Sequence, residues 1–228
     1  MAQAGVEANI SWREIDTVLL DMDGTLLDLH FDLHFWMEYL PLAFANKHNL
    51  THQQSKDHIY PILRAEEGKL NWYCLDYWQE VFKLDIVALK EEVAHLIQIH
   101  PFVLEFLQQA RAHKKRVFLV TNAHRKTLAL KMRMTNLECY FDQIISSHDY
   151  NVAKEEQAFW HKLESHVQLK KNTSIFFDDS ISVLNSAKEF GVKHVVAISK
   201  PSSKAEAKEI QGFINIENFE QMLPVEPH

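Results

Sequence analysis

Five short apolar runs divide this chain, and each has the length and composition of a buried parallel strand. They lie at residues 17–20, 117–120, 143–146, 174–177 and 195–198, and the first strand is expected to extend to about residue 21. From residue 101 onward, stretches with helical spacing separate the runs, as in Val103, Phe106, Leu107 and Ala110. A further short strand and helix are expected within 213–223. Strands that alternate with helices indicate βαβ units, so the pattern predicts an α/β fold with a parallel sheet.

Residues 31–97 carry a different pattern, and we call them the helical insertion. Strand-like runs are absent, aromatic residues crowd together, and apolar side chains such as Trp36, Leu40 and Phe44 follow helical spacing. Trp72, Leu75 and Trp78 stand three residues apart and are expected to face inward on one helix. Because the segment stands between the first and second strands, we predict a separate helical domain at 31–97. The remaining residues, 1–30 and 98–228, then form the core domain.

Charge and composition exclude several classes of protein. A formal net charge of −7 without a clustered basic run argues against a sequence-independent grip on nucleic acid. No apolar run is long enough to span a bilayer, and residues 1–11 lack the features of a secretory signal. The two cysteines, Cys74 and Cys139, form no CxxC motif, which favours free thiols in a reducing compartment. We therefore expect a cytoplasmic protein, either a monomer or a homodimer.

Polar residues follow three of the predicted strands at the point where each strand ends. They are Asp21 and Asp23 after the first run, Thr121 and Asn122 after the second, and Asp178 and Asp179 after the fourth. Each pair alone is explained equally well as a helix cap or a turn. Parallel strands, however, bring their carboxyl ends to one edge of the sheet, where ligands of open α/β folds bind. Buried carboxylates need a partner, and a divalent cation would supply one.

These residues also form a known set of motifs. DMDGT at 21–25, a strand ending in Thr121, Lys154 and FFDDS at 176–180 occur in the order of the four motifs of the haloacid dehalogenase (HAD) superfamily. The chain resembles that superfamily over roughly residues 15–200. The resemblance implies a HAD-like Rossmannoid core of three layers and places the helical insertion where the family has its C1-type cap. Within the family, residues 17–29, 71–78 and 120–123 resemble the bacterial GMP/IMP nucleotidases.

The resemblance implies a Mg²⁺-dependent phosphomonoesterase that acts on a small phosphate ester, a purine nucleoside 5′-monophosphate. Asp21 is then the nucleophile that forms an aspartyl-phosphate, and Asp23 transfers protons to the leaving group and from water. Mg²⁺ would be held by the Asp21 carboxylate, the Asp23 backbone carbonyl, Asp178 and Asp179. Of the last two, Asp179 is our first choice for direct contact.

The substrate-binding residues follow from the same resemblance. Thr121 would donate a hydrogen bond to the phosphoryl oxygens, with Asn122 and its N–H nearby as part of the substrate site. Lys154 would hold the phosphate and Asp21 in line by charge. Many relatives have Pro after this lysine, whereas Glu155 follows it here. Lys162 is therefore an alternative to Lys154.

Other functions stay open at this point. A phosphosugar phosphatase or a phosphoglucomutase-like enzyme would use the same motifs, and a catalytically silent binding protein could share the fold. A dehalogenase is disfavoured because its chemistry does not use a second acid such as Asp23. A nucleobase needs an aromatic or guanidinium face and a few polar contacts at its edge, and the sequence offers five candidates: Phe35, Asn71, Trp72, Tyr73 and Arg125. For most of them, packing in the protein core is the alternative and favoured role.

Overall fold

Six parallel strands form a single sheet in the order β3-β2-β1-β4-β5-β6. The strands are β1 (Thr17–Leu20), β2 (Arg116–Thr121), β3 (Gln143–Ser146), β4 (Ser174–Asp178), β5 (His194–Ile198) and β6 (Ile214–Ile216). This computed structural model describes residues 10–227, so the first nine residues of the predicted core lie outside it. All five predicted strands are confirmed, and β6 is the further short strand expected near residue 213.

The register of the sheet aligns the ends of its central strands. Leu20 of β1 pairs with Leu119 of β2 on one side and with Phe177 of β4 on the other. The residues that follow these positions therefore leave the sheet at one common edge. That edge is where sequence analysis expected the site.

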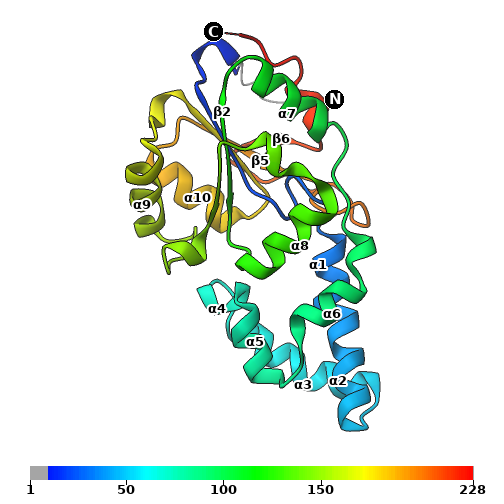
Figure 1. Cartoon of the computed structure of the whole chain (residues 1–228). Helices are drawn as coiled ribbons and strands as arrows, with labels where there is room; N and C mark the ends of the chain where they lie inside the picture. Colours follow the sequence, from blue (N-terminus) through cyan, green and yellow to red (C-terminus); the bar gives the residue numbers. More distant parts are fainter. Residues whose placement is uncertain (1–9, 228) are drawn as a thin grey trace.

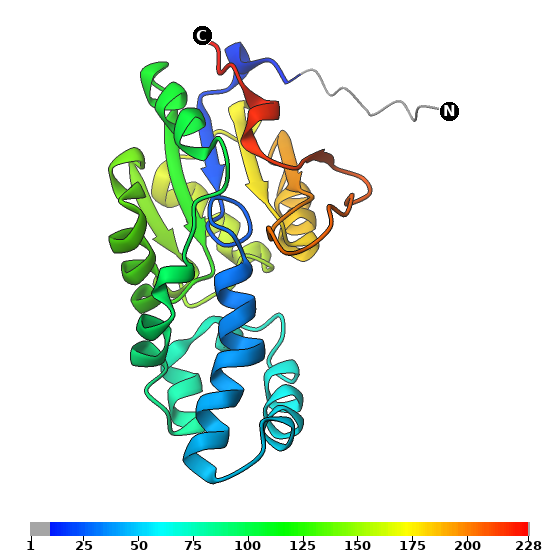
Figure 2. The same cartoon turned by 90° about the vertical axis from the view of Figure 1, so that its right-hand side faces the viewer.

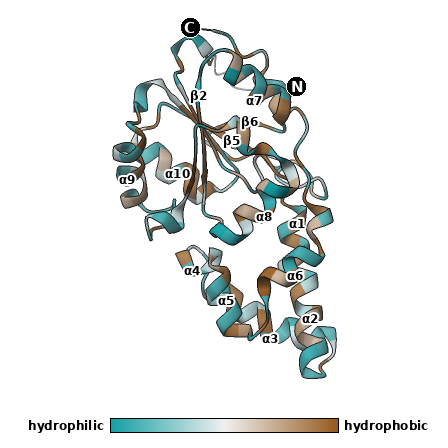
Figure 3. Cartoon of the chain, viewed as in Figure 1, coloured by the Kyte–Doolittle hydropathy of each residue, from teal (hydrophilic) through white to brown (hydrophobic). Residues whose placement is uncertain are grey.

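Helices cover both faces of the sheet, as Figure 1 shows. They are α7 (Val103–Ala112), α8 (Arg125–Thr135), α9 (Gln157–Val167) and α10 (Ile181–Phe190). Val18 and Leu20 pack with α7 and α8 in one apolar cluster, whereas Leu19 between them packs with α9 and α10 in another. This alternation is the two-residue period of a strand buried on both faces. The apolar strands lie between more polar helices (Figure 3), and the predicted three-layer α/β fold is confirmed.

The helical insertion extends from the carboxyl edge of the sheet (Figure 2). Its elements are α1 (His30–His34), a π-helical turn (Phe35–Tyr39) that runs on into α2 (Leu40–His48), α3 (His52–Arg64), α4 (Leu70–Tyr73), α5 (Leu75–Phe82) and α6 (Ile86–Glu92). These elements share an apolar cluster that includes Phe31, Trp78 and Phe82. Leu130 of α8 joins this cluster, so the insertion packs directly on the core.

One local prediction within the insertion is wrong. Trp72, Leu75 and Trp78 were expected on one continuous helix, but α4 ends at Tyr73 and α5 begins at Leu75. Cys74 between them has extended backbone angles (φ −88°, ψ 108°). The Trp78 indole N–H donates to the Trp72 carbonyl at 2.8 Å. In a regular helix this carbonyl would instead accept from the backbone amide four residues later.

Short 3₁₀ turns complete the fold at Trp12–Glu14, Ala94–Leu96, Leu137–Tyr140, Ser147–Asp149, Lys171–Thr173 and Phe219–Met222. Within residues 10–227, no helix is long and apolar enough to cross a lipid bilayer.

Candidate active site

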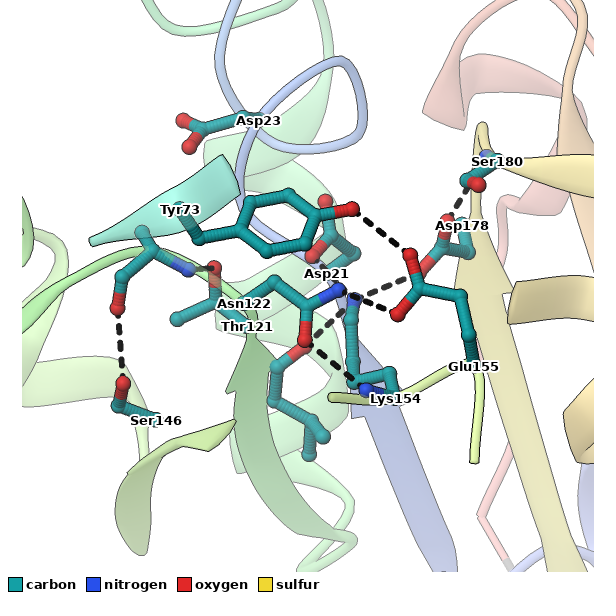
Figure 4. A network of polar contacts seen from close by, with 12 residues as sticks. Asp21, Asp23, Tyr73, Thr121, Asn122, Ser146, Lys154, Glu155, Asp178 and Ser180 are labelled. Carbon is teal, nitrogen blue, oxygen red and sulfur yellow. Dashed lines mark hydrogen bonds and ion pairs between the residues drawn. The ribbon is translucent and has the colours of Figure 1, made fainter. Parts of the chain in front are cut away.

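A cavity of about 170 Å³ opens at the carboxyl ends of β1, β2 and β4, and all seven predicted site residues line it. They are Asp21, Asp23, Thr121, Asn122, Lys154, Asp178 and Asp179. Most of them appear together in Figure 4, where they converge from different strands and loops. Strand register alone brings three pairs of these residues together: Asp21 with Asp23, Thr121 with Asn122, and Asp178 with Asp179. Each pair follows one strand, and β1 lies between β2 and β4 in the sheet.

Lys154 lies at the centre of the acidic residues. Its buried Nζ contacts Asp21 Oδ1, donates to Asp178 Oδ2 at 2.7 Å and reaches the Val120 carbonyl at 3.1 Å. Burial by itself lowers the pKa of Lys154, but the charges of Asp178 and Asp21 outweigh burial and raise it. The alternative, Lys162, is exposed on α9 and donates to the backbone carbonyl of Tyr150. The structure therefore brings Lys154, and not Lys162, into the cavity.

Three carboxylates of the cavity are suited to hold a divalent cation. Oxygen atoms of Asp21, Asp178 and Asp179 all lie within 4.8 Å of one another. Burial raises the pKa of Asp21 to about 6 and that of Asp178 above its usual range. Burial, together with Asp178 and Asp21, raises the pKa of Asp179 well above normal. One lysine is too little positive charge for three carboxylates, two of them buried, so the donor set fits a hard divalent ion with oxygen ligands.

Gly24 supports Asp179 by having no side chain. A Cβ on Gly24 would lie 2.5 Å from Asp179 Oδ2, and the φ of +81° there also favours glycine. Asp178 instead uses both its oxygens in hydrogen bonds, from the Ser180 amide at 2.8 Å and from Lys154. This division leaves Asp179 better suited than Asp178 to contact a metal directly.

Asp23 belongs to a separate buried ion cluster that the sequence did not reveal. Lys131 of α8 donates to Asp23 Oδ1 and to Asp32 Oδ2, each at 2.5 Å, and Lys90 of α6 donates to Asp32 Oδ1 at 2.8 Å. Burial raises the pKa of Asp32, but Lys131 and Lys90 outweigh it and lower the value to about 2. The signal for Lys131 was its place three residues after Leu128 on the buried face of α8.

The environment of Asp23 suits proton transfer. Burial raises its pKa to about 6, with Asp32 and Asp21 acting in the same direction and Lys131 against them. A carboxyl group that titrates near neutral pH can both donate and accept a proton during turnover.

A hydrogen-bonded chain joins the helical insertion to the phosphate side of the cavity (Figure 4). The Tyr73 hydroxyl donates to Glu155 Oε1 at 2.7 Å, and the Asn122 side-chain amide donates to Glu155 Oε2 at 2.9 Å. Asn122 Oδ1 in turn accepts from the Lys154 amide at 3.0 Å. Glu155, which stands where many relatives have Pro, thus ties Tyr73 to the loop that carries Lys154.

Thr121 is held for hydrogen bonding. Its buried Oγ1 accepts from the Ala123 amide at 3.0 Å, which leaves the hydroxyl proton able to point into the cavity.

A second cavity of about 260 Å³ adjoins the first, and the two share Asp23, Leu29, Tyr73 and Ala123. Its further lining comes mainly from the helical insertion and includes Trp36, Met37, Trp72, Leu75 and His124. Small-molecule sites are commonly apolar and aromatic in this way.

Three of the five residues predicted as candidates for contact with a nucleobase do not line the second cavity. Phe35 is fully buried in the core of the insertion, Asn71 donates to Glu66, and Arg125 pairs with Asp149 away from both cavities. Trp72 and Tyr73 do line the second cavity. Trp36 and Met37 were not singled out, because their spacing is equally typical of core positions on a helix.

Comparisons with known proteins cover almost the whole chain. The family model for haloacid dehalogenase-like hydrolases matches residues 15–191. The chain is 36% identical over 216 residues to the GMP/IMP nucleotidase YrfG of Escherichia coli K12, covering 95% of this chain and 97% of that protein. It is 20% identical over 221 residues to a phosphorylated carbohydrates phosphatase of Thermotoga maritima, covering 92% and 98% of the two. The crystal structure of a HAD phosphatase from Thermococcus onnurineus superposes with a TM-score of 0.76 at 20% identity, covering 91% and 96% of the two chains.

Proposed function

The chain belongs to the haloacid dehalogenase-like hydrolase family, and from that membership we propose that it hydrolyses purine nucleoside 5′-monophosphates such as GMP and IMP. The family resemblance inferred from the motifs is thereby confirmed, as is a hydrolase that acts on phosphate monoesters. The purine substrate is supported by the 36% identity, over nearly the full length, to a GMP/IMP nucleotidase.

The observation that carries the proposal is the junction of two unlike cavities at Asp23 and Tyr73. The polar cavity, with its acids and Lys154, suits a phosphate group. The apolar cavity, with Trp36, Met37 and Trp72, suits the flat faces of a base. Asp23 stands between them, where the bond from phosphorus to the 5′-oxygen would lie.

In the proposed first step, a carboxylate oxygen of Asp21 attacks phosphorus. The bond between phosphorus and the nucleoside 5′-oxygen breaks, and Asp23 gives its proton to that oxygen. Lys154 orients the Asp21 carboxylate through their ion pair and, with the Thr121 hydroxyl, binds the phosphoryl oxygens. The nucleoside leaves, and an aspartyl-phosphate remains on Asp21.

In the proposed second step, Asp23 is an ionised carboxylate and takes a proton from water. The water oxygen attacks phosphorus, the bond to Asp21 breaks, and inorganic phosphate is released. Asp23 is then protonated again and Asp21 is free.

We further propose that the divalent metal is Mg²⁺, held by Asp21, the Asp23 carbonyl, Asp179 and, directly or through water, Asp178. When bound, it would neutralise the repulsion between the Asp21 carboxylate and the phosphate dianion. Residues 31–97 would act as a cap that excludes water from the aspartyl-phosphate. A cytoplasmic location and a monomer or homodimer remain predictions from the sequence.

Release of inorganic phosphate from GMP, IMP and a series of hexose phosphates, with Mg²⁺ present, tests the substrate class. We expect the two nucleotides to be preferred. Preference for hexose phosphates would instead support the phosphosugar alternative, which the Thermotoga maritima relative favours.

The Asp21→Asn variant tests the nucleophile, and we expect it to lose activity by on the order of 10³-fold or more. Asp57→Asn is a matched control, because Asp57 is an exposed carboxylate of the helical insertion that lines neither cavity and accepts a hydrogen bond from the Gln53 side chain. Unchanged turnover in Asp21→Asn would contradict the proposed mechanism. A wild type that releases no phosphate from any of these esters would instead favour the catalytically silent binding protein.

A further inference from the structure

Cys74, His124 and His148 come together at a point that the proposed reaction does not use. Their ligand atoms, a thiol sulfur and two imidazole nitrogens, all lie within 4.8 Å of one another. Cys74 comes from the break between α4 and α5 in the helical insertion, His124 follows β2, and His148 follows β3. We propose that these three residues form a second metal site, which binds a Zn²⁺-class cation and ties the helical insertion to the core.

His148 is already arranged as a metal ligand. Its Nε2 is buried and, among residues 10–227, has no hydrogen-bond partner. The ring also has a hydrogen bond with the Asn122 backbone that favours the protonated ring, as a bond donated to the carbonyl does. A bond of this kind from Nδ1–H would leave the lone pair of the unpartnered Nε2 free to bind a metal. Histidine ligands of metals commonly donate their other ring N–H to a carbonyl in this way.

Both imidazoles are held in the neutral form that a metal requires. Burial, together with the neighbouring His124, lowers the pKa of His148 to about 4. Burial also lowers the pKa of His124. The two rings meet edge to face with centroids 5.0 Å apart. His124 Nδ1 accepts a long bond of 3.4 Å from the Lys126 amide, a contact that a metal could displace at small cost.

The ligands of this proposed site favour a different metal from the one expected at the three carboxylates. One thiolate and two imidazoles suit Zn²⁺ and similar borderline-soft ions, whereas Mg²⁺ prefers oxygen ligands. A fourth position could be taken by water or by Asp76, whose Oδ2 lies 3.7 Å from His124 Nε2. Three protein ligands with one open position is an ordinary zinc arrangement.

The site joins the helical insertion to the core, the two parts that, in the function proposed above, open to admit substrate and close over it. His124 also lines the apolar cavity, so the metal would sit at its margin. An ion held by Cys74 on one side and the two histidines on the other would stabilise the closed arrangement. Because opening often limits turnover in enzymes with such lids, we expect Zn²⁺ to slow the reaction when Mg²⁺ is saturating.

Cobalt absorption tests the binding without any substrate. With Mg²⁺ in excess, Co²⁺ titrated into the wild type should give a thiolate-to-cobalt charge-transfer band that Zn²⁺ abolishes. Cys139→Ser is the matched control, because Cys139 is the other free cysteine and is exposed; it should keep the band. Cys74→Ser should lose it, and His148→Gln should weaken binding by at least about tenfold. A wild type without the band, or a band that survives Cys74→Ser, overturns the proposal.

The tie between insertion and core has its own readout. Inhibition of phosphate release by Zn²⁺ should need about 10–100-fold more Zn²⁺ in Cys74→Ser than in the wild type or Cys139→Ser. Equal inhibition of all three overturns the tie. The cobalt spectrum does not depend on which phosphate ester is hydrolysed, so it separates failure of this site from failure of the proposed function.

Discussion

Replacing Lys131 with methionine removes the charge that faces Asp23 while keeping most of the side-chain volume. Lys131 is 1% exposed and donates to Asp23 and Asp32 at 2.5 Å each. In the variant, Asp32 still has Lys90 at 2.8 Å, but Asp23 loses its cationic partner. The perturbation therefore falls mainly on the proposed acid–base group.

The magnitude follows from the burial of the pair. Removing one partner of a buried ion pair costs about 3–5 kcal/mol, because the other charge is left without compensation. The Asp23 side chain is 23% exposed and can regain some hydration, so we expect the lower end, about 3 kcal/mol. For a chain of this size, that loss corresponds to a fall in Tm of about 6–12 °C.

The loss should depend on pH. The pKa of Asp23 is about 6 in the folded protein, above its usual value of 3.8, so the ionised form is the one that folding disfavours. Without Lys131 the pKa rises further, and the destabilisation grows once Asp23 ionises. The difference in Tm between wild type and Lys131→Met should thus be greatest near about pH 8 and shrink toward about pH 5. In the proposed mechanism the alkaline limb of the rate profile should also move to higher pH.

Thermal unfolding of the wild type, Lys131→Met and the control Lys162→Met across this pH range tests the prediction. Lys162 is exposed and donates to the Tyr150 carbonyl, so its variant should stay within about 0.5 kcal/mol of wild type. If Lys131→Met unfolds like Lys162→Met, or if the difference between them grows as the pH falls, the ion-cluster reasoning is refuted.

Three further predictions follow from the cavity. Gly24→Ala should raise the Mg²⁺ concentration needed for half-maximal activity by about tenfold or more, because the new Cβ would displace Asp179. Gly68→Ala is the control: Gly68 has a φ of +79° and nothing within 4 Å of an added Cβ, so this variant should show only the effect of backbone strain. Tyr73→Phe should cost about 1.5–3 kcal/mol in chemical unfolding through loss of the bond to Glu155, and an unchanged midpoint would contradict that contact. Chelation by EDTA should abolish phosphate release and added Mg²⁺ should restore it, whereas activity that persists in EDTA would argue against a metal at the carboxylates.

The strands and the polar residues at their ends could be predicted because both depend on short-range pattern. An apolar run such as 174–177 forms a strand from its own composition, and Asp178 then follows wherever that strand ends. Parallel pairing brings such ends to one edge, so Asp21, Thr121 and Asp178 needed no knowledge of helix packing. Lys154 was found only through motif order, since its distance from Asp21 along the chain carries no local signal.

Local sequence pattern was therefore enough to predict the α/β class, the edge of the sheet that holds the site, and the acids that line it. The tertiary structure decided which side chains meet across elements: Lys131 with Asp23, Tyr73 with Glu155, and Cys74 with two histidines. These contacts depend on the angle and depth at which the helical insertion packs on the core. Helical periodicity places a residue on a face, but it does not say which residue of a distant element that face will meet.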